Sequence, residues 1–249
     1  INAGIARDHQ QLAVDLKDRR FAIRGEASHA NAAVDLQKLE ISASDASLQA
    51  SGKLQLDELK FTLDAKLQRF DPSRFARVPA ARINATIQAS GQLQDKPQVD
   101  ASFELNDSLF AGQPMSGQGQ LKLAWPTIPA IAIRLALGDN HLDASGAFGK
   151  PGDRLLLVID APKLEPFGGE GGIAGRIELA GSLAQPQLAA DLQAATLGIP
   201  GAFRLRGLKL AAQLAEAAEA PLHLDLALEH LESAAPIRLA SKLKLSASG

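Results

Sequence analysis

The sequence predicts an all-β protein built as a long antiparallel meander. Apolar or glycine residues alternate with polar ones from end to end, as in Ile83-Asn84-Ala85-Thr86-Ile87, and a period of two is typical of a half-buried strand. Short polar turns separate these runs, and no competing helical pattern interrupts them for long. The third observation is composition, because Ala and Leu dominate while the chain has 9 Phe, one Trp and no Tyr.

About sixteen alternating runs follow one another, and each is expected to be one strand. In order they cover residues 11–17, 20–27, 32–41, 46–56, 60–69, 81–94, 98–106, 117–125, 130–137, 141–148, 154–160, 173–183, 187–194, 202–214, 221–230 and 237–247. Hairpin-length polar turns join them, for example 56–59, 95–97, 138–140, 149–152 and 184–186. Turns this short place successive strands side by side and antiparallel.

Each strand is expected to have one apolar and one polar face. In residues 60–68, Phe61, Leu63 and Leu67 oppose Lys60 and Thr62. The apolar phase of the runs supplies the predicted ligand-facing residues. These are Phe61, Leu63, Leu67, Ile83, Ile87, Leu93, Val99, Phe103, Leu105, Leu121, Leu123, Ile131, Ile133, Leu135, Leu137, Leu155, Leu157, Ile159, Ile177, Leu179, Leu222, Leu224, Leu226 and Leu228.

Two stretches are expected to interrupt the meander, residues 70–80 and 162–172. In the first, Asp71 is placed to cap a short helical turn that Pro72 opens. The second is rich in Gly and Pro and is expected to be a loop. The apolar phase changes near Gly207, which predicts a bulge there. The Ala-rich stretch 211–220 permits a helical turn, but its alternation favours a strand.

Glycine also marks a loose repeat along the chain. Gly52, Gly91 and Gly146 each follow Ala-Ser, and Gly181 follows Ala180 in a related segment. The spacing between these segments is irregular. We therefore expect a drifting β-repeat rather than a strict solenoid.

Composition excludes several classes of function. The formal net charge of -2 gives no general attraction to nucleic acid, and the densest basic cluster, Arg69, Arg74, Arg77 and Arg82, is expected to be a solvated rim. The absence of cysteine excludes disulfides, thiolate zinc sites and cysteine nucleophiles. We expect no nucleic-acid partner.

The chemistry-bearing residues do not form a known catalytic or metal motif. No serine lies in a G-x-S-x-G elbow and no glycine-rich segment has phosphate-loop spacing. His223 and Asp225 share a strand face, but the facing segments supply no further His or Cys, whereas a metal site needs three or more converging ligands. We expect no enzyme, no cofactor and no bound metal.

The apolar face is therefore the candidate functional surface, and two interpretations remain open. It is either the core of an ordinary β-sandwich or an open wall that binds an apolar ligand. Sandwich cores usually include several aromatic side chains, so the aliphatic lining favours an open or thinly filled interior. Counting apolar side chains that face an open space would distinguish the two.

Several segments resemble the repeated region of the TamB-type proteins of the AsmA-like family. They are residues 157–164, 175–188, 110–119 and the Phe70-Asp71-Pro72 turn that leads towards Gly91. The resemblance runs over most of the chain and implies that the antiparallel sheet curls into an open U-shaped trough, or β-taco, with an apolar interior. It also implies that residues 1–249 are a single elongated segment, an internal piece of a longer chain.

The function implied by the resemblance is lipid transport. A lipid-binding conduit segment would shield phospholipid acyl chains in the apolar groove between the bacterial inner and outer membranes. Its place would be the periplasm of a Gram-negative bacterium, with the full-length protein anchored in the inner membrane and contacting an outer-membrane barrel partner of the Omp85 type. The alternative is a periplasmic scaffold that templates β-strands during outer-membrane protein or autotransporter assembly.

Overall fold

The computed structural model describes residues 2–6, 9–19, 21–74, 76, 78–214, 222–233 and 243–248. The chain divides into two units, Ile1–Trp125 and Pro126–Gly249. In both units, every pairing between neighbouring strands is antiparallel. The predicted all-β antiparallel meander is therefore confirmed, with nineteen strands in the described residues instead of about sixteen.

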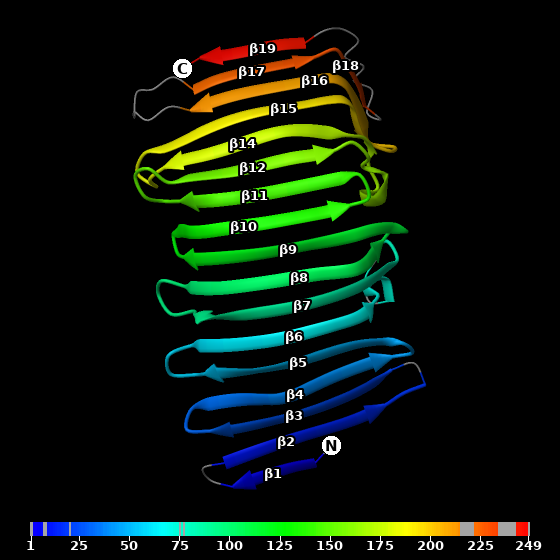
Figure 1. Ribbon diagram of the computed structural model, residues 1–249, viewed down its shortest axis with the longest axis vertical. Coiled ribbons are helices and arrows are strands. Elements are labelled where there is room, and N and C mark those ends of the chain that lie inside the picture. The colour runs from blue at the N-terminus through cyan, green and yellow to red at the C-terminus, as the bar shows by residue number, and fades with distance from the viewer. Residues whose placement is uncertain are drawn as a thin grey trace. The chain divides into compact units, whose positions relative to one another are not determined.

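The first unit contains strands β1 to β9, and each pairs with the next in the chain (Figure 1). The strands are β1 (Asn2–Ala6), β2 (His9–Lys17), β3 (Ala22–Ala30), β4 (Ala33–Ala43), β5 (Ala46–Gln55), β6 (Lys60–Phe70), β7 (Ala81–Gln92), β8 (Gln98–Phe110) and β9 (Gln113–Ala124). A single 3₁₀ turn, η1 (Pro72–Arg74), lies between β6 and β7. No described pairing within this unit joins β1 to β9, so its sheet is open.

The second unit follows the same plan. Its elements are β10 (Thr127–Leu137), β11 (Asn140–Phe148), β12 (Arg154–Ala161), η2 (Glu165–Phe167), β13 (Glu170–Gly171), β14 (Ile173–Gly181), β15 (Pro186–Ile199), β16 (Phe203–Leu214), β17 (Leu222–Leu228), β18 (His230–Ser233) and β19 (Leu243–Ser248). The short β13 pairs with the end of β15, while β14 pairs with its beginning. In the same way, β17 and β18 pair with successive parts of β16.

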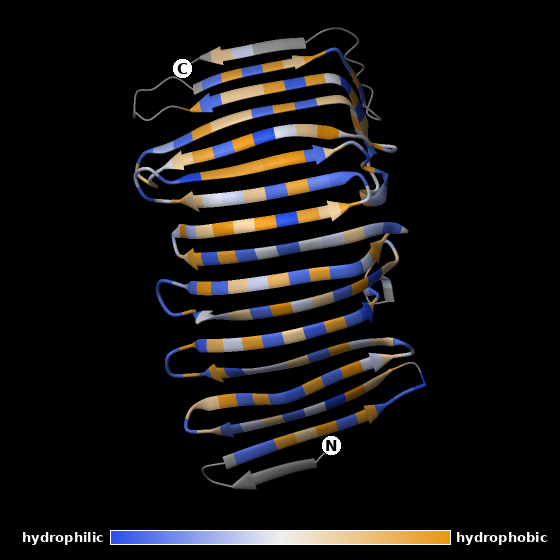
Figure 2. Cartoon of the chain, viewed as in Figure 1, coloured by the Kyte–Doolittle hydropathy of each residue, from blue (hydrophilic) through white to orange (hydrophobic). Residues whose placement is uncertain are grey.

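Hydropathy alternates along most strands, as Figure 2 shows by the change between hydrophilic and hydrophobic positions. Because directly paired residues point to the same side of a sheet, the register joins the apolar positions into rows that cross many strands. The apolar and the polar faces of the sheet therefore follow from the period of the sequence together with the pairing register. Strand β12 departs from this pattern with five apolar residues in succession, residues 155–159.

The two interruptions contain short helical turns. Asp71 caps η1 as predicted, since its carboxylate accepts the Ser73 backbone N–H at 3.1 Å and also the Ala81 N–H at 3.1 Å. The glycine-rich stretch was expected to be a loop throughout, but Glu170 and Gly171 form β13. They do so because the end of β15 continues past β14 and offers them a free length of strand.

The bulge predicted at Gly207 is wrong. The pairs Ala194↔Leu208 and Thr196↔Arg206 have the same register on both sides of Gly207, so neither β15 nor β16 carries an extra residue there. Gly207 instead takes a left-handed conformation with φ of 64°, which glycine adopts more readily than other residues. The Ala-rich stretch is strand as far as Leu214, and residues 215–220 lie outside the described residues.

Bulges that the sequence did not reveal lie at three successive strand pairings of the first unit. The register shifts between Leu67 and Phe70 where β6 pairs with β7, between Arg82 and Ala85 where β7 pairs with β8, and between Leu105 and Ser108 where β8 pairs with β9. The extra residues belong to β6 and β8. Bulges bend and twist strands, so these neighbouring shifts favour a bend at the end of β6, the start of β7 and the end of β8.

Polar side chains hold these bulges together. Asn84 accepts the Arg69 backbone N–H through its Oδ1 at 2.8 Å and donates from its amide nitrogen to the Asp107 carbonyl at 2.8 Å. Its own backbone N–H donates to the hydroxyl of Ser108 at 2.8 Å. Ser108 is 2% exposed, so this hydroxyl replaces the ladder acceptor that the bulge removes.

We expect Ser108→Ala to lower the free energy of unfolding by about 1–3 kcal/mol, because it removes the side-chain acceptor of the partly buried Asn84 N–H. Urea denaturation followed by circular dichroism measures the change. Ser116→Ala is the matched control, because Ser116 is an exposed residue of the neighbouring strand β9. Equal stability of the two variants would contradict a role for Ser108 in holding the bulges.

Candidate apolar binding face

The apolar residues of the first unit form continuous rows on one face of the sheet. Four rows cross β5 to β9 and contain only apolar residues or glycine. In strand order they are Leu54, Phe61, Gly91, Val99 and Leu123; Gly52, Leu63, Ala89, Ala101 and Leu121; Ala50, Ala65, Ile87, Phe103 and Gly119; and Leu48, Leu67, Ala85, Leu105 and Gly117. The rows extend into β4 through Val34, Leu36, Leu39 and Ile41.

The second unit has an equivalent apolar face. Its three longest rows run from β10 to β17. They are Ile131, Gly146, Leu155, Leu179, Leu188, Leu214 and Leu222; Ile133, Ala144, Leu157, Ile177, Ala190, Ala212 and Leu224; and Leu135, Leu142, Ile159, Gly175, Leu192, Leu210 and Leu226. Leu137 and Leu228 lie beyond these rows and are buried, at 7% and 8% exposure.

These faces are not sealed in a core. Among the described residues, no large side chain is less than 2% exposed, and the apolar residues that count as buried are mostly alanines. Leu63, in the middle of the first unit's face, is 38% exposed. An ordinary sandwich would bury such a residue against a second sheet. The described structure therefore has an apolar wall that remains accessible to a ligand.

The structure brings most of the predicted ligand-facing residues together in these rows. Ile83 belongs to the same face, since it lies two residues before Ala85 on β7 and pairs with Phe70. Leu93 lies just past β7, which ends at Gln92, and is 50% exposed in the following hairpin. The backbone of Leu222 pairs with Leu214 at the start of β17, but its side chain is not among those that the structure describes. Whether these residues bind lipid stays a prediction.

Sequence reasoning missed part of the face. Leu36, Leu39, Leu48 and Leu54 lie in the same rows as the predicted residues and carry the same alternating signal. That signal was available in the sequence, because β4 and β5 alternate as the later strands do. The glycines on this face were not predicted as part of it either, although they occupy the apolar phase of the runs.

The opposite face is polar and carries cross-strand ion pairs. In the first unit Lys122 approaches Asp100 at 3.0 Å, and in the second Arg134 approaches Asp143 at 3.4 Å. Lys163 donates to Asp139 at 2.6 Å, and this hydrogen bond lowers the pKa of the Asp139 carboxyl group. These side chains are more than half exposed, so each pair adds little stability and mainly keeps this face hydrated.

A second ionic contact ties β13 to β16. Arg204 donates from its Nε to the Glu170 carboxylate at 2.8 Å and also lies 3.9 Å from Glu232 on β18. The hydrogen bond with Glu170 raises the pKa of the Arg204 guanidinium group. Arg204 therefore links the beginning of β16 to the short strands β13 and β18.

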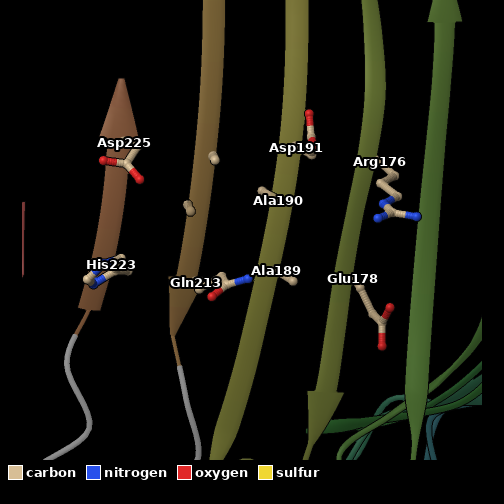
Figure 3. A pocket seen from close by; sticks show the side chains of 10 residues that line it. Arg176, Glu178, Ala189, Ala190, Asp191, Gln213, His223 and Asp225 are labelled. Atoms are coloured by element: carbon tan, nitrogen blue, oxygen red, sulfur yellow. The ribbon is translucent and has the colours of Figure 1, made fainter. Parts of the chain in front are cut away.

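The polar face of the second unit also has a shallow depression of about 340 Å³. Small side chains from β15 and β16 form its floor, and charged residues surround it, including Arg176, Glu178, Asp191 and Asp225 (Figure 3). His223 and Asp225 lie beside each other on β17, as predicted. Within the described part of the chain, no group of three or more His, Cys, Asp or Glu residues is placed to hold a metal ion.

The basic cluster is only partly described. Arg69 is exposed and is held by Asp45, whose backbone oxygen accepts from the Arg69 Nε at 2.9 Å. Arg82 is exposed on β7. The side chain of Arg74 and all of Arg77 lie outside the described residues. In the described ranges, no helix combines the length and the apolar character needed to cross a bilayer.

Comparison with known proteins identifies a family. A family model described as "TamB, N-terminal domain" matches residues 11–249. The chain is also 25% identical over 213 residues to the Translocation and assembly module subunit TamB of Haemophilus influenzae, an alignment that covers 83% of this chain and 16% of that protein. The chain thus spans about a sixth of the length of this relative. No solved structure matches it. The open apolar faces and a family match over almost the whole sequence lead to one conclusion: the chain belongs to the TamB family, in the part that the family model describes as the N-terminal domain.

Proposed function

We propose that this chain is a non-enzymatic, lipid-binding segment whose apolar faces shield the acyl chains of phospholipids. The observation that carries the proposal is the set of apolar rows that cross each sheet and remain partly exposed. An acyl chain that covers such a face removes its apolar surface from water. The gain is about 0.8 kcal/mol per buried methylene group.

The composition of the rows supports movement as well as binding. Their members are mostly Leu, Ile, Val and Ala, with two Phe and several Gly in the ligand-facing positions. Neighbouring sites therefore offer an acyl chain similar contacts, which keeps the free-energy differences between them small. A uniform wall without polar groups suits a ligand that slides.

The cellular setting is proposed by analogy with the relative. That protein is named a translocation and assembly module subunit, which supports a role for this chain in transport or protein assembly at the cell envelope. We propose that the segment lies in the periplasm of a Gram-negative bacterium and carries phospholipid between the inner and outer membranes. In this setting the full-length protein would be anchored in the inner membrane and contact an Omp85-type outer-membrane barrel.

The second candidate function is a scaffold that templates β-strands of outer-membrane proteins. The words "translocation and assembly" in the relative's name favour it. A scaffold would pair client strands with backbone groups at a sheet edge. A lipid conduit would use the side chains of the apolar rows instead, so the two functions depend on different parts of the sheet.

We expect a photo-reactive amino acid at Leu63 to crosslink to phospholipid when the chain is mixed with lipid vesicles, because Leu63 lies in the middle of the first apolar face. Mass spectrometry of the adducts identifies the lipid. The matched control is the same amino acid at Thr62, the preceding residue of β6, which is exposed on the polar face.

Two results would contradict the conduit. One is the absence of phospholipid adducts at Leu63, and the other is equal yields at Leu63 and Thr62. Adducts with unfolded outer-membrane protein that form at strand edges, without lipid adducts at Leu63, would favour the scaffold.

A further inference from the structure

The two edges of the first unit's apolar face differ in chemistry. At the edge formed by the hairpins between β5 and β6 and between β7 and β8, and by the residue that follows β9, large apolar side chains are exposed. Leu56, Leu59, Leu93 and Trp125 are 44%, 38%, 50% and 60% exposed. We call these four residues the hairpin lip. In Figure 1 this edge lies on the left of the first unit.

The lip continues the apolar face beyond the last paired row. Leu56 follows Leu54 by two residues, and Trp125 follows Leu123 by two, so each keeps the apolar phase of its strand. Backbone hydrogen bonds hold the hairpins next to each other, since the Leu93 N–H donates to the Leu59 carbonyl at 3.0 Å and the Trp125 N–H donates to the Pro97 carbonyl at 2.8 Å. The lip is therefore a continuous apolar margin.

At the opposite edge, small residues are buried. The buried apolar residues of the first unit, Ala46 and Ala85, lie at that end of the strands at 7% and 8% exposure, together with Ser108 at 2%. The bulge network described above fills the same edge with internal hydrogen bonds. Apart from Val78, which is 41% exposed, the large apolar residues that are exposed in the described loops of this unit belong to the lip.

Charged groups lie directly outside the lip. Asp57, Glu58 and Lys60 belong to the first hairpin and Asp95 and Lys96 to the second. Glu58 forms an ion pair with Lys60, and the hydrogen bond between them raises the pKa of the Lys60 ammonium group. An exposed Trp beside both signs of charge is the chemistry of a membrane interface, where an apolar body and a hydrated group meet.

The dimensions fit one acyl chain. Four apolar rows lie between the lip and the bulges. Rows are separated by two residues, about 6.6 Å at 3.3 Å per residue, so the fourth row lies about 26 Å from the lip. Half of a bilayer's hydrocarbon core is about 15 Å deep. An acyl chain that starts at the lip therefore ends before the bulges.

On this basis we propose that phospholipid binds the first unit in one orientation, with its headgroup at the hairpin lip and its acyl chains lying along the strands towards the bulges. This inference rests on the proposed function and adds the direction of the bound lipid. Trp125 contacts the ester region of the lipid. Because both signs of charge flank the lip, the preferred headgroup is zwitterionic, a phosphate with an amine.

Trp125 provides the test, because the chain has one Trp and no Tyr. Its fluorescence reports on the lip alone. We would mix the 249-residue chain with a zwitterionic phospholipid brominated near the ester end of one acyl chain, or near the methyl end. Bromine quenches Trp only at close range. The expected result is a larger loss of fluorescence with ester-end bromine.

A second variant carries the Trp inside the face. Trp125→Phe combined with Phe103→Trp moves the probe to the third row below the lip, about 20 Å away at 3.3 Å per residue. We expect the order of quenching to reverse there, with methyl-end bromine more effective. Circular dichroism checks that this variant folds, and the wild-type chain decides the orientation even without it.

The outcomes separate the inference from the proposed function. Stronger quenching of Trp125 by methyl-end bromine would place the headgroup at the bulges and overturn the orientation, while lipid binding would stand. Equal quenching by both lipids would overturn it too, since lipid would then lie across the strands. No quenching at either position, together with no lipid crosslinks at Leu63, would overturn both.

Discussion

Replacing Ile133 with arginine is expected to abolish lipid binding on the central row of the second unit without unfolding the protein. Ile133, Ala144 and Leu157 are neighbours in one apolar row. An acyl chain that covers this row would have to bury an unpaired guanidinium group. Placing arginine in a hydrocarbon environment costs about 2.5–3.5 kcal/mol, which corresponds to a loss of affinity of roughly a hundredfold.

The measurement uses a photo-reactive amino acid at Leu157, whose phospholipid adducts should disappear when Ile133→Arg is added. Ala132→Arg is the matched control, since Ala132 precedes Ile133 on β10 but is exposed on the polar face. Leu135→Asp tests the next row in the same way. Undiminished adducts with the charge in place would rule out the conduit.

The folding of the Ile133→Arg variant decides between an open face and a sealed core. A face that is open to water can hydrate the new charge when no lipid is bound, so the circular dichroism spectrum should not change. A sealed core would unfold, because an unpaired charge inside it has no compensation. Loss of structure would therefore revive the sandwich interpretation that the sequence left open.

The faces of the sheet were predictable from the sequence because the alternation has a period of exactly two over long runs. Phe61, Leu63 and Leu67 illustrate this, since each pairs with an apolar residue or glycine on both neighbouring strands. Hairpins of two to five residues then fix the order of the strands. Periodicity and turn length together determine the meander and the side of each residue.

Features that depend on register or on a single residue's conformation were not predictable. The aligned register shifts near Arg69, Asn84 and Ser108 require three successive strand pairings to change register at the same place, which no single strand signals. Leu93 continues the apolar phase of β7, so its sequence looks like strand, yet the hairpin begins there. The hairpin lip arises because apolar and polar residues continue to alternate past the point where the backbone pairing of the strands ends.

Strand β12 does not alternate within its run of five successive apolar residues, 155–159. The polar residues at its ends, Arg154 and Asp160, set the phase from which Leu155, Leu157 and Ile159 were predicted. The register agrees, because these three residues pair with members of the apolar rows, whereas Val158 pairs with Asp143 and Arg176 on the polar face. Val158 is consequently 39% exposed.

The glycine repeat has a physical explanation in the close approach of neighbouring strands. A Cβ atom at Gly52, Gly91 or Gly146 would lie 2.3, 2.1 or 1.9 Å from a backbone carbonyl oxygen of the next strand. Such distances are far below contact, so a side chain at these positions requires the strands to separate. The recurring Ala-Ser-Gly segments therefore mark places where the sheet permits only glycine.

Gly146→Ala is expected to be the most destabilising of the small substitutions. Gly146 has φ of 117°, a conformation that residues with a Cβ rarely adopt, and its added Cβ would overlap the Arg154 carbonyl oxygen. Strain of the backbone alone costs about 1–3 kcal/mol, and the overlap adds to it. Gly201→Ala is the control, because Gly201 has φ of 77° but open space around it. Urea denaturation of both variants separates the two contributions. The free energy of unfolding should fall in Gly201→Ala only by the cost of the backbone strain, and it should fall distinctly further in Gly146→Ala.

Since Gly146 lies between Ile131 and Leu155 in an apolar row, its replacement should also reduce phospholipid crosslinking at Leu157. Equal losses of stability in the two variants would show that the close approach of β11 and β12 contributes nothing to the need for glycine.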